Sequence, residues 1–161
     1  MLISDLRASD RLVMDTHVWV WASGEADGPG RLSDAALAGI ERAARGRRLF
    51  VSSASVWEIA LKAERGQAVV SADLHAWVRD QREYPGARVL ALDARIAVDC
   101  TRLPLWVRVR DAKEHRDPPD RFIVATARRV NGILLTCDDE ILTYAEQGHV
   151  RAHDASSRRS R

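Results

Sequence analysis

Arg11-Leu-Val-Met-Asp15-Thr16-His17-Val-Trp-Val-Trp21 is the stretch that decides the fold of this chain. Its short apolar run, residues 12–14, has the length and residue types of a buried parallel strand. The run ends in the carboxylate of Asp15, and in open α/β sheets ligands bind just outside the carboxyl ends of the strands. Asp15 taken alone is more often the N-cap of the helix that follows. Three further acids in comparable positions shift the balance toward a functional site.

The length and composition of the chain fit a single domain. With 161 residues, 46% of them hydrophobic, it is long enough to bury a sizeable core. We expect a leader over residues 1–10, one domain over residues 11–154 and a basic, disordered tail over residues 155–161. Cys100 and Cys137 lack the spacing of a zinc site or a disulfide framework, so both are predicted to be small core residues.

Nothing in the sequence points to a membrane or to secretion. No apolar run approaches the roughly 20 residues that a membrane-spanning helix needs. The first ten residues include Asp5, Arg7 and Asp10 and no long apolar stretch, which is unlike a signal peptide. We therefore predict a cytoplasmic protein with no membrane partner.

The formal net charge of +2 says little about the partners of the protein. Three of the 25 basic residues are arginines of the tail, and without them the 23 acidic residues slightly outnumber the basic ones. The body is therefore not a broadly basic nucleic-acid binder, and any contact with a polyanion must come from a local cluster. Two clusters are candidates, although such clusters are more often solvated surface: Arg45, Arg47, Arg48 and Arg108, Arg110, Lys113, Arg116.

Apolar runs that alternate with helical patterns predict an α/β protein with a central parallel sheet. Strands are expected at residues 12–14, 49–51, 88–92, 132–135 and, at an edge, 150–153. Helices are expected over residues 18–22, 34–46, 56–65, 72–82, 94–103, 118–127 and 141–147. Residues 105–114 are ambiguous, with a short helix as one interpretation. This order indicates a three-layer α/β/α architecture around a five-stranded parallel sheet.

Four carboxylates stand at strand ends or in the first turns of helices: Asp15, Glu58, Asp120 and Asp138. In this architecture such positions meet at one edge of the sheet. Two like charges 4 Å apart repel by about 4 kcal/mol at an effective dielectric near 20, so converging acids need a counter-ion. Oxygen ligands without Cys or His favour Mg²⁺ or Mn²⁺ over zinc. Such an ion activates water and stabilises the oxygens of a phosphodiester displacement, which predicts a nuclease site.

Several of these acids also have a purely structural interpretation. Glu58 and Lys62 have the i, i+4 spacing of a favourable ion pair, worth about 0.3–0.5 kcal/mol on an exposed helix. Asp117 before two prolines is a good N-cap, which leaves Asp120 in the first helical turn near the positive end of the helix dipole. This interpretation explains each position separately, but it does not explain why the positions converge.

Four motifs in this order resemble the PIN-domain ribonucleases, and particularly the VapC-type toxins of prokaryotic toxin–antitoxin pairs. Each motif is weak by itself, but their order and spacing over residues 12–154 make the resemblance strong. The motifs are Leu-Val-Met-Asp15-Thr16-His17-Val-Trp19, Ser52-Ser53-Ala-Ser55-Val-Trp57-Glu58-Ile59-Ala60-Leu61-Lys62, His115-Arg-Asp117-Pro118-Pro119-Asp120-Arg121-Phe-Ile-Val-Ala125-Thr126-Ala127 and Leu134-Leu135-Thr136-Cys137-Asp138.

The resemblance implies a PIN-like fold, RNA cleavage, and hydroxyls of Thr16 and Thr136 that orient a carboxylate or a metal-bound water. The third motif commonly has an aromatic residue where this chain has Pro119, which affects the local packing rather than the chemistry. Asp138 and Asp139 are adjacent, and the Thr-x-Asp spacing favours Asp138 as the ligand. By position, the resemblance assigns a bound Mg²⁺ or Mn²⁺ ion to Asp15, Glu58, Asp120 and Asp138.

Further polar residues near the motifs carry weaker expectations. His115 is a candidate for contact with substrate phosphate or for proton donation, although a packing role is more common at such a position. Lys62 and Arg121 are candidates for phosphate contact, with ion pairing to the adjacent acids as the default. Asp117 and Asp139 are candidates for a supporting role beside the four ligands.

The implied partners are an RNA substrate, a cognate antitoxin protein and a second copy of the chain in a homodimer. Trp19 and Trp21, two residues apart, cannot both face one core from a helix. A groove near Trp19, Trp21 and Trp57 is therefore a reasonable place for an antitoxin segment.

Three alternatives remain at this point. The chain is also consistent with a housekeeping PIN nuclease in RNA processing, or with a PIN-like module that only binds RNA or protein. A receiver-like signalling module would use Asp93 as its central acid, but it needs a lysine after the last strand, and none follows Lys113.

Overall fold

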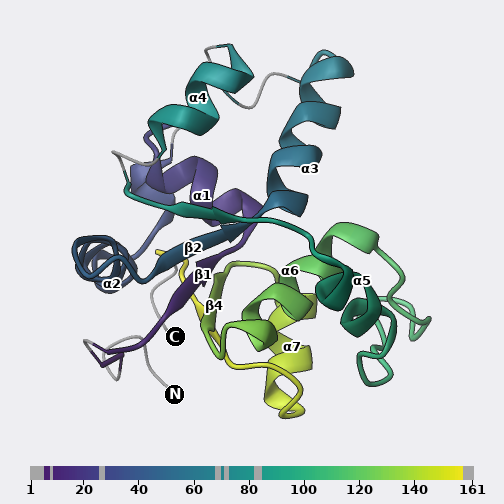
Figure 1. Ribbon diagram of the computed structural model, residues 1–161. Helices are drawn as coiled ribbons and strands as arrows, with labels where there is room; N and C mark the ends of the chain where they lie inside the picture. The colour runs from purple at the N-terminus through teal and green to yellow at the C-terminus, as the bar shows by residue number, and fades with distance from the viewer. Residues whose placement is uncertain are drawn as a thin grey trace.

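The computed structural model describes residues 6–7, 9–25, 28–67, 70, 73–81 and 85–157 of the chain. Its centre is a five-stranded parallel sheet with the strand order β3-β2-β1-β4-β5 (Figure 1). The prediction of an α/β fold around such a sheet is confirmed. The strands are β1 (Leu12–Met14), β2 (Leu49–Ser52), β3 (Arg88–Leu90), β4 (Ile133–Thr136) and β5 (Ala152–Asp154).

Seven α-helices and one short 3₁₀ helix, η2 (Pro29–Arg31), surround the sheet in the described part of the chain. Their starts follow local capping chemistry, since the side chains of Ser33 and Asp93 accept hydrogen bonds from Ala36 N and Ile96 N. The helices are α1 (Thr16–Ala22), α2 (Asp34–Arg45), α3 (Ser53–Glu64), α4 (Leu74–Asp80), α5 (Ala94–Thr101), α6 (Pro118–Arg129) and α7 (Asp139–Glu146).

The alternation of side chains along the strands builds a core on each face of the sheet. Leu12 and Met14 pack with buried residues of α1, α2 and α4 on one face. Val13 and Leu134 pack with buried residues of α6 and α7 on the other. Figure 1 shows these two helical layers on opposite sides of the sheet. The three-layer arrangement follows from strands that are buried on both faces.

The strand order places a topological switch point between β1 and β4. From β1 the chain moves to β2 and β3 on one side, and from β4 it moves to β5 on the other. In doubly wound sheets ligands bind at this point, outside the carboxyl ends of the strands. The order 3-2-1-4-5 also differs from the 2-1-3-4-5 order of receiver domains, so the receiver alternative is wrong.

The structure corrects several local expectations. Residues 105–114 do not form a helix; Val107 and Glu114 pair in an isolated antiparallel bridge. Helix α3 begins at Ser53, three residues before the expected start, because Ser52 acts as its N-cap and accepts a hydrogen bond from Ala54 N.

The body of the domain also continues past residue 154, where we expected the tail to begin. Ala155 is fully buried, donates its backbone N–H to Thr136 O and accepts from Ser33 N. The predicted helix over residues 72–82 is described over 74–80, and residues 72 and 82 lie outside the described part of the chain. Among the described residues, no helix has the length and apolar character that crossing a bilayer requires.

Candidate active site

Asp15 lies at the switch point, directly after β1, and its side chain is only 4% exposed. Its carboxylate Oδ1 accepts a hydrogen bond from Thr16 N at 2.6 Å, and Oδ2 accepts from Thr136 Oγ1 at 2.8 Å. The first bond caps helix α1, as the structural interpretation expects. The second joins the carboxyl ends of β1 and β4, so Asp15 is both a cap and part of the edge where a ligand binds.

Two threonine hydroxyls connect Asp15 to the acids of neighbouring elements. Thr136 Oγ1, which donates to Asp15, also accepts from the backbone N of Asp138 at 3.0 Å. The hydroxyl of Thr16, which follows Asp15, donates to Glu58 Oε2 at 2.8 Å and lies 2.9 Å from Ser55 Oγ. The carboxylates of β1 and α3 and the start of α7 are thus held together at one edge of the sheet.

Glu58 also has the ion pair that its spacing predicts. Its Oε1 lies 2.7 Å from Lys62 Nζ, and both side chains are mostly buried. Lys62 therefore follows its default role. Since the other oxygen of Glu58 accepts from Thr16, each oxygen of the carboxylate has a protein donor.

Asp120 approaches the same edge from the first turn of α6. Its Oδ2 lies 2.9 Å from Nε2 of His115, whose side chain is buried. Asp117 is the N-cap residue of α6 by position, although its carboxylate makes no capping hydrogen bond, and Pro119 is buried in the first turn. Helix α6 therefore begins where the third motif predicts it, although Pro119 replaces the usual aromatic residue.

The electrostatics of the site show that these acids influence one another. Burial, with further contributions from Asp120 and Glu58, raises the pKa of Asp15 to about 7, although hydrogen bonds from Thr136 and Thr16 oppose the shift. Partial burial, followed by the charge of Asp120, raises the pKa of Asp117, and weaker contributions come from Glu58 and Asp138. A cation at this edge would lower both pKa values.

The donor set fits a hard divalent cation by its chemistry, because it consists of carboxylate and hydroxyl oxygens. Within the described residues, however, no three side chains of the Asp, Glu, His and Cys types are placed so that they could hold an ion together. The carboxylates face protein donors instead: Thr136 and Thr16 for Asp15, Lys62 for Glu58 and His115 for Asp120. Binding of an ion would require some of these side chains to turn.

Three other candidates from the sequence take clear positions. Asp138 is partly buried and caps α7, with Oδ1 accepting from Glu140 N at 2.7 Å, whereas Asp139 is exposed in the first turn of that helix. The expectation that Arg121 pairs with adjacent acids is wrong. Its guanidinium donates to the backbone carbonyls of Cys100 and His115, where it ties α5 to the segment before α6.

The aromatic packing behind His115 was missed by the sequence analysis. The His115 ring stacks on Trp106, with ring centroids 4.1 Å apart, and Trp106 stacks in turn on Tyr144 at 4.4 Å. The buried Tyr144 hydroxyl donates to Pro104 O. Trp106 and His115 are nine residues apart in the sequence, so no local pattern indicated their stacking, and the contact with Tyr144 of α7 depends on the tertiary fold.

The tryptophan prediction needs a correction. Trp19 is fully buried, packs against Trp77 with tilted rings and donates its indole N–H to Gln81, so it cannot line a groove. Trp21 is partly buried beneath the guanidinium of Arg31. Trp57 is 54% exposed on α3, next to Glu58. Of the three, Trp57 is the one that presents a large apolar surface to a partner.

The fold and the site define a class of protein, namely a doubly wound α/β domain with a buried carboxylate, that of Asp15, at its switch point. A family model described as PIN domain matches residues 12–147, and the chain belongs to the PIN domain family. No curated protein matches the sequence.

Two solved structures share the fold. One is the crystal structure of VapBC2 from Rickettsia felis bound to a DNA fragment from their promoter, at a TM-score of 0.57 and 12% identity over 88% of this chain and 96% of that chain. The other is a domain of a functionally unknown protein from Methanocaldococcus jannaschii, at a TM-score of 0.53 and 15% identity over 95% of this chain and 96% of that chain. At these identities the likeness concerns the fold alone.

Proposed function

We propose that this PIN domain is a metal-dependent endoribonuclease that serves as the toxin of a toxin–antitoxin pair. The observation that carries the proposal is the buried Asp15 at the switch point, joined through Thr136 and Thr16 to the elements that bear Asp138 and Glu58. PIN domains are generally nucleases, and the resemblance to VapC-type toxins extends over all four motifs. The raised pKa of Asp15, to about 7 through burial, is of the kind that functional carboxylates commonly have.

In this proposal Asp15, Glu58, Asp120 and Asp138 hold one or two Mg²⁺ or Mn²⁺ ions. The bound ion would supply an activated water and stabilise the negative charge that develops on the phosphodiester. Thr136 and Thr16 orient the carboxylates of Asp15 and Glu58. His115, in the segment before α6, holds the carboxylate of Asp120. Lys62 neutralises one oxygen of Glu58, which limits the repulsion among the acids before a cation binds.

The proposed partners follow the same reasoning. We propose that an antitoxin protein binds this chain and keeps the nuclease inactive. The resemblance to VapC-type toxins supports this partner, and the fold shared with VapBC2 agrees with it. Trp57 is a candidate contact for it. The homodimer and the cytoplasmic location stay predictions.

The test is incubation of the purified protein with structured cellular RNA in Mg²⁺, in Mn²⁺ and in EDTA, followed by mapping of the cut ends. We expect cuts at a few discrete positions that require metal and that disappear in Asp15→Ala and Asp120→Asn. Loss of a direct metal ligand should exceed the roughly 10- to 100-fold loss that is typical of residues behind the ligands.

The control is Asp34→Asn, which also removes an acid from the first turn of a helix, α2, but lies outside the motifs. It should cleave at the wild-type rate. If a folded wild-type protein cleaves no RNA in either metal and shows no metal-induced change in melting temperature, the binding-only alternative replaces the nuclease.

A further inference from the structure

The connection between α5 and α6 carries a prominent exposed loop, which we call the basic loop (residues 105–116) and which lies beside α5 in Figure 1. Leu105 is 69% and Val109 63% exposed, and the loop carries one of the two basic clusters of the sequence, Arg108, Arg110, Lys113 and Arg116. The nuclease proposal uses only His115 from this segment. The other residues of the basic loop have no role in it.

The basic loop is anchored at its base rather than hanging free. Its two ends meet where His115 N donates to Trp106 O at 2.6 Å, and Arg108 N donates to Lys113 O at 2.8 Å. Trp106 is 1% exposed and lies between the rings of His115 and Tyr144. The tip is tied to α7 as well, because Val109 N donates to Glu140 Oε2 at 2.7 Å. This anchoring fixes the position of the loop relative to the site.

The same anchor connects the basic loop to the acids. His115 stacks on Trp106 with its ring and contacts the Asp120 carboxylate with Nε2. Arg110 is four residues from Trp106, and Lys113 is two residues from His115. A chain of four residues spans at most about 14 Å. A few nucleotides of a single RNA strand cover the same distance.

Two cations of the basic loop have no ion pair among the described residues. Arg108 pairs with Asp111 and Arg116 with Glu114, both at 2.6 Å. The cations nearest the acids are also engaged, Lys62 with Glu58 and Arg121 with backbone carbonyls. Arg110 and Lys113 remain, and both are exposed. They are available to a ligand without the loss of an existing ion pair.

We propose that the basic loop is an RNA-binding arm, in which Arg110 and Lys113 bind phosphates of the strand that enters the acid edge. The inference rests on the proposed nuclease function. A polyanion approaching the four carboxylates at this edge meets repulsion, so cations placed a few nucleotides away are needed to hold it. Leu105, Val107 and Val109 provide apolar contact for unstacked bases and sugars of single-stranded RNA.

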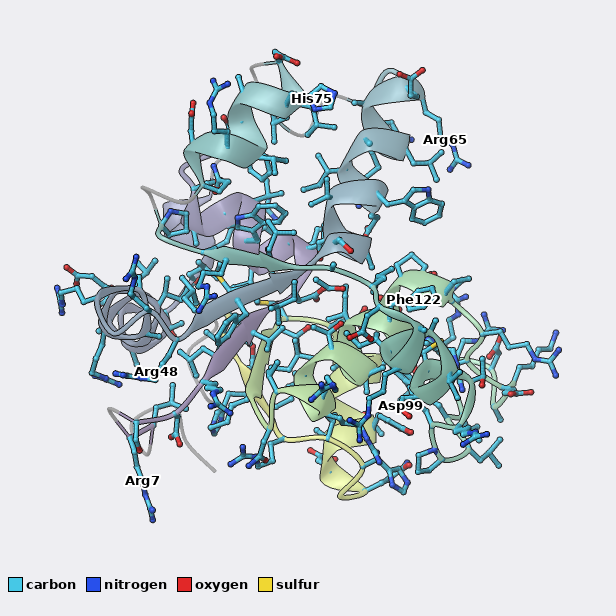
Figure 2. All side chains as sticks on the ribbon, viewed as in Figure 1. Arg7, Arg48, Arg65, His75, Asp99 and Phe122 are labelled. Atoms are coloured by element: carbon cyan, nitrogen blue, oxygen red, sulfur yellow. The ribbon has the colours of Figure 1, made fainter. Side chains whose placement is uncertain are left out.

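The test compares two double variants with the same change in charge. The first is Arg110→Gln with Lys113→Gln. The control is Arg7→Gln with Arg129→Gln, which removes two exposed cations before the amino ends of β1 and β4, at the opposite edge of the sheet. Figure 2 shows Arg7 at the lower left of the view, well away from Phe122 of α6.

The measurement is binding of a labelled single-stranded RNA oligonucleotide of mixed sequence in EDTA, between about 50 and 200 mM salt. For single strands the slope of log affinity against log salt is about −0.7 for each phosphate contact. The basic-loop variant should reduce the magnitude of the slope by about 1.4 and weaken binding, whereas the control should leave both unchanged. Equal melting temperatures would establish that all the variants fold.

The outcomes separate this inference from the nuclease proposal. If the wild-type protein cleaves RNA but the basic-loop variant has the same slope of log affinity against log salt as the wild type, the RNA-binding arm is wrong and the nuclease proposal stands. A changed slope in a protein that never cleaves would support the arm and overturn the nuclease. If the basic-loop variant binds RNA normally but loses a co-purified antitoxin, the loop is a protein-binding surface and the inference is wrong.

Discussion

Asp15 and Asp120 reach one edge of the sheet from different elements, a strand and a helix, and their surroundings differ. Asp15 follows a strand, is 4% exposed and is held by two hydrogen bonds from a threonine hydroxyl and a backbone amide. Asp120 sits in a helical turn, is partly exposed and contacts one imidazole. The comparison teaches that two acids with the same proposed role can differ greatly in the free energy needed to keep each carboxylate charged in the folded protein. Desolvation of the charged form depends on burial.

The largest expected effect concerns stability against pH without metal. Because the pKa of Asp15 rises from 3.8 to about 7 in the folded state, the folded protein binds more protons between these values. The contribution of Asp15 to stability should therefore fall as the pH rises from about 4 to about 7, and level off above. Asp15→Asn removes this dependence and should gain a few kcal/mol at pH 8, at about 1.4 kcal/mol per pKa unit.

The measurement is urea unfolding in EDTA from about pH 4 to pH 8, with Asp120→Asn as the matched variant. Asp120 is partly exposed, so its replacement should change stability much less. Equal gains from both variants would break the contrast between the buried and the half-exposed acid.

The next effect tests whether both acids serve one ion. A ligand that binds only the folded state stabilises it by about 2.7 kcal/mol at a hundredfold excess over Kd. Mn²⁺ or Mg²⁺ should therefore raise the melting temperature of the wild-type protein, and the increase should vanish in both Asp15→Asn and Asp120→Asn. An increase that survives in Asp120→Asn would show that α6 does not contribute a ligand.

A smaller loss is expected when the connection between Asp15 and Asp138 is cut. Thr136→Val keeps the shape of the side chain but removes the hydroxyl that donates to Asp15 and accepts from Asp138 N. Leaving buried polar groups unpaired should cost about 1–3 kcal/mol in the free energy of unfolding. Thr136→Ser keeps the hydroxyl and should behave like the wild type in denaturant unfolding; an equal loss in both variants would mean that packing, not the hydrogen bonds, matters.

The smallest effect belongs to the ion pair on α3. Lys62→Gln should cost about 0.5 kcal/mol, in the range of helical i, i+4 pairs, because Glu58 keeps its hydrogen bond from Thr16. Thermal unfolding measures the difference, with Arg45→Gln on α2 as the control for an i, i+4 pair that is mostly exposed. A loss of several kcal/mol would indicate that Lys62 offsets the charge of the whole acid cluster.

Much of the fold could be predicted from local patterns. The apolar runs of β1, β2 and β4 and the caps at Ser33, Asp93 and Asp117 lie where the sequence indicates them, because strand burial and capping depend on neighbouring residues. Where local signals conflict, the predictions were poorer. Residues 105–114 have both helical and extended character, and the antiparallel bridge between Val107 and Glu114 decides for an irregular loop.

By itself the sequence determined the α/β class, the parallel sheet and the positions of the acids at strand and helix ends, since periodicity and capping are local properties. Only the tertiary structure decided the strand order, which places β1 beside β4 and excludes a receiver fold. It alone brought Thr136 to Asp15, 121 residues away, stacked Trp106 between His115 and Tyr144, and buried Trp19 and Ala155. These contacts join distant segments through packing of the whole core, which no local pattern encodes.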